Sequence, residues 1–342
     1  MARIIPQDKK PVKNLMNAIE SKDMSVVVQG AVASQTGEII QKIRALFPLV
    51  EIILSTWEGQ DTSGCDADRV VCSADPGCFV QNPKIQGDGF YNNVNRQIVS
   101  TRAGLQAASR RYALKTRTDI FINTGDWMRY FGRYDKASPP VFFNSRVLIC
   151  NYYSRNPRVF ALPFHWGDWV FFGETEDLKN VFSIPLMEGE DRDWFHTNKR
   201  DSNLFRDNIN RYVPEQWILA SFLRKHMPLA FDCFYDASMQ NIITTEKFFA
   251  ENTVILDADQ WGIRFVKYNP NRYKEKATLL HARDWHLLYR RYIQNKKGMP
   301  WFLHLTRAFL WRVLYLHVRP LFMRGLAFLG VKEAVRKWLN RG

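Results

Sequence analysis

Three polar clusters of the chain follow short apolar runs, and their side chains are the first candidates for chemistry. The clusters are Gln29-Gly30, Thr56-Trp57-Glu58 and Arg117-Thr118-Asp119. In open α/β sheets, ligands bind beyond the carboxyl ends of the strands. The Asp119 carboxylate, fixed there on rigid backbone, can hold a divalent cation that bridges two phosphates. An acid at a strand end is as often a helix cap or a turn residue, which is the alternative for Asp119.

An alternation of strands and helices must position these clusters. Residues 25–30 and 51–56 are apolar runs, and residues 36–47 between them carry apolar side chains at helical spacing, which predicts a parallel βαβ unit over residues 24–56. The further expected strands are residues 69–72, 112–119, 142–144, 146–150 and 169–172, and the further expected helices are residues 92–112 and 214–225. The fold class is therefore α/β. The acidic residues 188–193 are expected to form a solvated loop without a role.

The net charge of +14 is concentrated at one end of the 342-residue chain. Residues 290–342 carry twelve lysines and arginines and one acid, a net charge of +11, which leaves +3 for residues 1–289. We therefore expect one domain over residues 1–289 and a basic, aromatic helical tail over residues 290–342. Because the charge is confined to an apolar tail without a binding motif, no nucleic-acid partner is expected.

The cysteines and the N-terminal residues bear on the compartment. The five cysteines are odd in number and form no C-x-x-C pair, which favours a reducing compartment. The spacing of Cys65, Cys72 and Cys78 matches no standard zinc site, so incidental thiols are the preferred interpretation. The first residues show no apolar signal segment, and a cytoplasmic location is expected.

Six motifs lie along residues 24–285, at residues 27–32, 47–59, 95–101, 115–119, 163–169 and 211–216. In this order they resemble the WavE-type lipopolysaccharide synthesis proteins. The resemblance implies a glycosyltransferase with a Rossmann-like, GT-A-type nucleotide-sugar-binding domain and a mixed, mostly parallel sheet. In that fold an Asp-x-Asp motif binds metal and diphosphate. Here only the final acid, Asp119, is kept, and Arg117 stands where the first acid would be.

The resemblance also implies residues that bind the donor. The expected donor-binding residues are Gln29, Gly30, Thr56, Trp57, Asn95, Arg96, Gln97, Arg117 and Asp119. A divalent Mn or Mg ion is expected on Asp119, with His281 as a second ligand, whereas Arg117 is able to contact phosphate directly. The alternative for His281 is an imidazole that binds no metal and makes its hydrogen bonds to other protein groups. An exposed helical turn is the alternative for residues 95–97.

A glycosyl acceptor must lose a hydroxyl proton, which requires a carboxylate as general base. Asp168 ranks first, because its aromatic neighbours raise its pKa and suit sugar rings. Glu215, after Pro214, is the alternate base or an acceptor-binding residue, and its other interpretation is an acid that favours the helix dipole. The expected acceptor-binding residues are His165, Trp166 and Trp169.

The aromatic tail, residues 299–341, contains no uncharged run long enough to cross a bilayer. Its aromatic residues alternate with arginine and lysine, as in a helix at an anionic membrane surface, and Pro320 is expected to divide it into two helices. Packing on the domain or on a sister subunit is the alternative.

These patterns predict a glycosyltransferase that transfers sugar from a nucleotide-sugar donor to a lipid-linked lipopolysaccharide or capsular polysaccharide. It is expected on the inner face of the bacterial inner membrane as a peripheral protein. The alternative function is a non-catalytic scaffold, associated with membrane or nucleic acid, that has a degenerate nucleotide-sugar fold.

Overall fold

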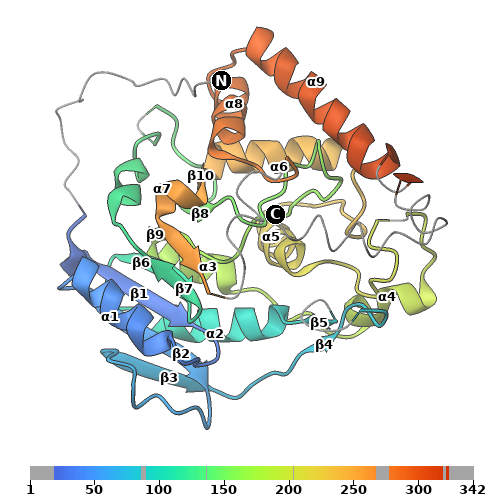
Figure 1. Cartoon of the computed structure of the whole chain (residues 1–342). Coiled ribbons are helices and arrows are strands. Elements are labelled where there is room, and N and C mark those ends of the chain that lie inside the picture. The colour runs from blue at the N-terminus through green and yellow to red at the C-terminus, as the bar shows by residue number, and fades with distance from the viewer. Residues whose placement is uncertain are drawn as a thin grey trace.

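A seven-stranded sheet runs through the centre of the computed structural model (Figure 1). The model describes residues 19–85, 90–135, 137–202, 204–266, 277–318 and 321–322. The strand order is β10-β8-β9-β6-β1-β2-β3. The strands are β1 (Met24–Gln29), β2 (Glu51–Trp57), β3 (Arg69–Ser73), β6 (Tyr112–Arg117), β8 (Val147–Cys150), β9 (Phe171–Glu174) and β10 (Thr253–Leu256). Two small antiparallel sheets join β4 (Phe79–Val80) to β5 (Tyr91–Asn92) and β7 (Ile120–Ile122) to β11 (Ile263–Phe265).

Only β9 runs against the other strands of the central sheet. The pairs of β1 with β2 and β6, of β2 with β3, and of β8 with β10 are parallel, whereas β9 pairs antiparallel with both β6 and β8. The expected α/β class with a mixed, mostly parallel sheet is confirmed. Because β9 is reversed, the residues that precede it lie at the edge where the other six strands end.

Helices cover both faces of the sheet (Figure 1). They are α1 (Thr36–Leu46), α2 (Val94–Ala107), α3 (Thr175–Phe182), α4 (Glu190–Thr197), α5 (Pro214–Arg224), α6 (Met239–Asn252), α7 (Ala258–Trp261), α8 (Ala282–Tyr292) and α9 (Met299–Val313). Every residue of β1 and β2 is buried, as expected of strands covered on both faces. Helix α2 lies against β1 and β2 at Gly104, where a Cβ atom would stand 2.4 Å from Val27 Cγ1.

Most expected elements are found within a few residues of their expected bounds, and four expectations need correction. Residues 142–144 form bends, because the Asn252 side chain accepts hydrogen bonds from the backbone N–H groups of Val141 and Phe142. The expected strand over residues 112–119 ends at Arg117, and β7 continues in a separate sheet.

The other two corrections concern helices. The helix expected over residues 92–112 is shorter, because α2 ends at Ala107 and the chain then turns into β6. The acidic residues 190–193 begin helix α4, whose residues are all at least partly exposed. In the tail, α9 continues into a π-helical turn, Leu314–Val318, while Pro320 and residues 323–341 lie outside the described residues.

Candidate active site

The reversed strand β9 brings Asp168 to the end of β6. Lys115 of β6 is paired with Phe171 of β9, and the Lys115 ammonium donates a hydrogen bond to the backbone carbonyl of Asp168. Gly167 is required just before it, because a Cβ atom there would stand 1.9 Å from the Tyr152 carbonyl oxygen. The Gly167 N–H donates to Ser154 Oγ at 2.8 Å. Packing between two segments therefore fixes the position of Asp168.

The Asp168 carboxyl group is buried, with 2% of the residue exposed. Burial raises its pKa, while the charges of Lys115 and Arg117 and the side chain of Gln97 favour the ionised form. Its Oδ1 atom accepts no hydrogen bond from the described residues. A carboxylate oxygen of this kind can accept a hydrogen bond from a ligand hydroxyl group, or its proton.

Glu215 is the electrostatic partner of Asp168. Burial, together with the charge of Asp168, raises the pKa of Glu215 to about 8, and the charge of Arg155 opposes this shift. Two neighbouring carboxyl groups do not readily ionise together, so Glu215 holds a proton at neutral pH. His165 Nε2 lies 3.6 Å from Glu215 Oε2, and burial lowers the pKa of His165 to about 3, which keeps its imidazole neutral.

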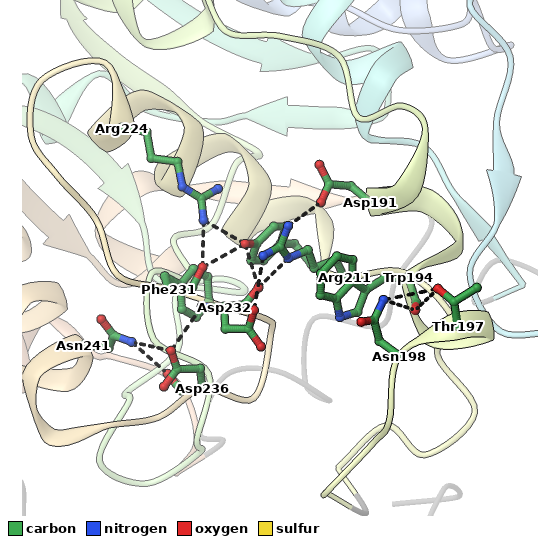
Figure 2. A network of polar contacts seen from close by, with 11 residues as sticks. Asp191, Trp194, Thr197, Asn198, Arg211, Arg224, Phe231, Asp232, Asp236 and Asn241 are labelled. Carbon is green, nitrogen blue, oxygen red and sulfur yellow. Dashed lines mark hydrogen bonds and ion pairs between the residues drawn. The ribbon is translucent and has the colours of Figure 1, made fainter.

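A network of polar contacts holds the chain that leads into Glu215 (Figure 2). Arg211 contacts Asp191 at 3.1 Å and Asp232 at 3.2 Å, and its guanidinium lies over the Trp194 ring. Arg224, on the last turn of α5, donates to the Phe231 carbonyl at 2.8 Å (Figure 2). Pro214 opens α5 with its fixed φ angle. Both ends of α5 are therefore anchored, and Glu215 in its first turn is held in place.

Lys115 is a candidate site residue that the sequence analysis missed. Its side chain is fully buried, and burial lowers its pKa to about 7 although Asp168 favours the charged form. One feature of the sequence could have indicated it: a lysine stands in the middle of an expected strand, where burying an unpaired charge would be costly. Its contact with Asp168 comes from strand order, which local sequence patterns do not reveal.

Arg117 and Asp119 form a bidentate ion pair at the end of β6. Arg117 Nε lies 2.8 Å from Asp119 Oδ1, and Nη2 lies 2.7 Å from Oδ2. The guanidinium also lies over the Trp169 ring, 5.1 Å from its centroid. Both oxygens of the only acid in this motif therefore face a permanent cation.

His281 lies at the same edge of the sheet, but with different partners. Its Nδ1 is 3.0 Å from Asp257 Oδ1, after β10, and 3.2 Å from the Asn151 side chain, after β8. It also caps α8. Among the described residues, no three His, Cys, Asp or Glu side chains are grouped as metal ligands. Asp119 is therefore paired with Arg117, and His281 with Asp257 and Asn151.

The other expected donor-binding residues are spread along β1, β2 and α2. Gln29 accepts a hydrogen bond from Ser100 Oγ at 2.5 Å, and Gly30 adopts a φ of +121° beside Thr118. The buried Thr56 hydroxyl has no partner among the described residues, and Trp57 ends β2.

Two residues of α2 bind protein groups. Asn95 donates to the Met187 carbonyl at 3.1 Å and accepts from its N–H at 2.8 Å, while Arg96 forms an ion pair with Asp75 at 2.6 Å. Gln97, one position on, is the residue of this segment that lies beside Asp168.

The two tryptophans of the acceptor motif differ in position. Trp166 is fully buried and packs on Phe171 and Phe248. Trp169 packs between Tyr153 and Phe265, beneath Arg117. Of the two, Trp169 lies with the site residues.

The backbone is strained in both segments that hold the site. Tyr153 has a φ of 59° and Phe164 a φ of 57°, in the left-handed region that bulky residues rarely adopt. Such strain is characteristic of functional sites, where the surrounding packing enforces it.

A family model described as WavE lipopolysaccharide synthesis matches residues 24–317. The chain belongs to this family. The match of the WavE model includes α8 and α9 and so extends beyond the motifs noted in the sequence. No curated protein matches the chain.

Among solved structures, this WavE-family chain is similar to an active-site mutant of LgtC, with 10% identity and a TM-score of 0.27. The match covers 46% of this chain and 59% of the LgtC chain. A TM-score this low does not establish a shared fold, and the α/β class rests on the strand order itself.

Proposed function

We propose that this WavE-family chain is a glycosyltransferase with a GT-A-like fold, acting in the cytoplasm. It would move a sugar from a nucleotide-sugar donor to a lipopolysaccharide or capsular glycan. The observation that carries the proposal is the carboxyl pair of the buried Asp168 and the partly buried Glu215, beside the basic side chains of Lys115, Arg117 and Arg155. Membership of a lipopolysaccharide synthesis family supports the class of acceptor.

The two carboxyl groups are suited to different tasks. We assign the role of general base to Asp168, because the charges of Lys115 and Arg117 oppose the rise that burial gives its pKa. Glu215, whose pKa is raised to about 8, keeps its proton and can donate a hydrogen bond to a sugar oxygen. His165, neutral beside Glu215, can accept or donate one further hydrogen bond.

The reaction is a single displacement at the anomeric carbon. Asp168 takes the proton of an acceptor hydroxyl while that oxygen forms a bond to the anomeric carbon. The bond from this carbon to the diphosphate breaks, and its electron pair leaves with the nucleoside diphosphate. The leaving group gains negative charge, which Arg117 at the end of β6 stabilises.

Nucleotide-sugar turnover in a donor panel tests the function. Purified full-length protein is incubated with UDP-, GDP-, ADP- and dTDP-sugars and extracted lipid-linked glycans, and released nucleoside diphosphate is measured. We expect acceptor-dependent release from one donor, and Asp168→Asn should lower the rate at least ~100-fold. An Asp201→Asn variant, whose exposed carboxylate pairs with Lys199 outside the carboxyl pair and its supporting network, is the matched control.

Calorimetric titration of the same nucleotides, with EDTA or with added Mn or Mg, tests how the donor is held. If Arg117 contacts the donor diphosphate directly, EDTA should leave nucleotide binding unchanged. Arg117→Ala should then weaken that binding. Loss of binding in EDTA would instead support the metal ion expected at Asp119. Absence of turnover and of binding for every donor, by folded protein, would refute the proposed function.

A further inference from the structure

Helix α9 has one face that packs on the domain. His304 and Ala308 are buried, and His304 Nδ1 lies 3.7 Å from Asp284 Oδ1 on α8. The Trp301 ring stacks on His304 and meets the Tyr292 ring edge-on. These contacts fix the rotation of α9, and therefore determine which of its side chains face outward.

The opposite face of α9 and the turn after it is apolar and exposed. Met299 is 67% exposed, Phe302 63%, Phe309 65% and Leu310 62%. Nine of the seventeen large apolar side chains that are exposed among the described residues lie between 299 and 322. The other eight are scattered over separate elements, so, within the part of the chain that the structure describes, the continuous apolar face lies on α9 and the residues just after it. Such faces mark interaction sites.

A groove continues this apolar face. It has a volume of about 420 Å³. The groove is lined by Leu303, Thr306, Arg307, Leu310, Trp311 and Leu314. Because four of these six side chains are apolar and all lie on α9 or the turn after it, the groove is suited to hydrocarbon chains.

The charge around this face decides which occupant it fits. Residues 290–318 contain six lysines and arginines and no acid, and Lys296 and Lys297 are exposed. Anionic lipids attract such cations by about 1 kcal/mol each near the surface. A second copy would bring the same positive charge to the interface and be repelled. Among the described residues, no helix is long and apolar enough to cross a bilayer.

We propose that α9 lies in the surface of an anionic bilayer, with its exposed apolar face among the acyl chains and with its arginines, and Lys296 and Lys297 just before it, at the headgroups. This inference does not depend on the proposed glycosyl transfer. It explains why one face of α9 is apolar and exposed while His304 and Ala308 on the other face pack on the domain. The geometry is that of an interfacial amphipathic helix.

Flotation of full-length protein with vesicles tests the proposal. Phosphatidylcholine vesicles with phosphatidylglycerol should carry the protein upward in a gradient, and pure phosphatidylcholine vesicles should bind at least ~10-fold less. The double variant F309S/L310S should bind anionic vesicles at least ~10-fold less, because each change removes apolar area that the acyl chains would bury. Lys296→Glu with Lys297→Glu should weaken binding mainly at low salt.

The matched control is Val141→Ser, which removes an exposed apolar side chain elsewhere (61% exposed) and should bind as the unaltered protein does. Circular dichroism establishes that each variant is folded. Failure of the folded, unaltered protein to float with anionic vesicles would overturn the proposal. Sedimentation as a dimer that F309S/L310S dissociates would assign the face to a second copy instead.

Discussion

Lys115 donates a hydrogen bond from its buried ammonium to the backbone carbonyl of Asp168, although 53 positions separate the two residues. The contact exists because β9 is antiparallel to β6 and returns the chain to the carboxyl edge of the sheet. Lys115 thereby acts on the Asp168 carboxyl group in two ways, by holding its backbone and by favouring its ionised form. We regard it as a positioning residue.

Replacing Lys115 by methionine should shift the pH dependence of the transfer reaction. Without the cation, the pKa of Asp168 rises further, so the acidic limb of kcat/KM should move to higher pH by about one unit. A pH profile of kcat/KM measures the shift. A variant that merely lost stability would lower the rate at every pH and leave the limb where it was.

Glu215→Gln should reduce the loss of stability as the pH rises. The pKa of Glu215 is raised to about 8 in the folded protein, so the unfolded chain releases this proton at lower pH. As the pH rises between these two pKa values, the free energy of unfolding falls by up to about 1.4 kcal/mol per pH unit. Urea unfolding at pH 5 and pH 8 should show a smaller difference for the glutamine variant. An equal difference in both proteins would contradict the raised pKa.

Gly167→Ala should destabilise the fold by about 2–4 kcal/mol, because the added Cβ atom collides with the Tyr152 carbonyl. Gly64→Ala is the control, since a Cβ atom there meets no atom within 4 Å. Its free energy of unfolding should stay within about 0.5 kcal/mol of the original value. Equal stability of the two variants in urea would show that this close approach is not required.

Asn95→Ala distinguishes a structural role from donor binding. The variant leaves the buried N–H and carbonyl of Met187 without their partner, which should cost about 1–3 kcal/mol. Arg96→Ala removes a partly exposed ion pair and should cost at most about 1 kcal/mol. Urea unfolding measures both costs. Unchanged stability with weaker nucleotide binding in Asn95→Ala would support the expected donor-binding role.

The sequence was sufficient to predict the βαβ unit, because buried parallel strands and an amphipathic helix leave strong periodic signals. Asp168 and Glu215 were found from their neighbours, and their proposed roles remain predictions. The contact of Asp168 with Lys115 could not be predicted from the sequence, because nothing in residues 169–174 indicates that this strand is antiparallel to its neighbours. The sequence does not distinguish the roles of Trp166 and Trp169. Their packing in the structure shows that Trp166 is a core residue and that Trp169 lies beside the site residues.

Phe160 connects the candidate site to the end of α9. Its ring lies 5.3 Å from the Arg155 guanidinium and 6.4 Å from the Tyr315 ring, and the Arg155 N–H donates to the His165 carbonyl. With α9 on a bilayer, these contacts would hold the active site at a constant height above the lipid. A lipid-linked acceptor would then meet the enzyme by diffusion in two dimensions, at an effective concentration far above its bulk value.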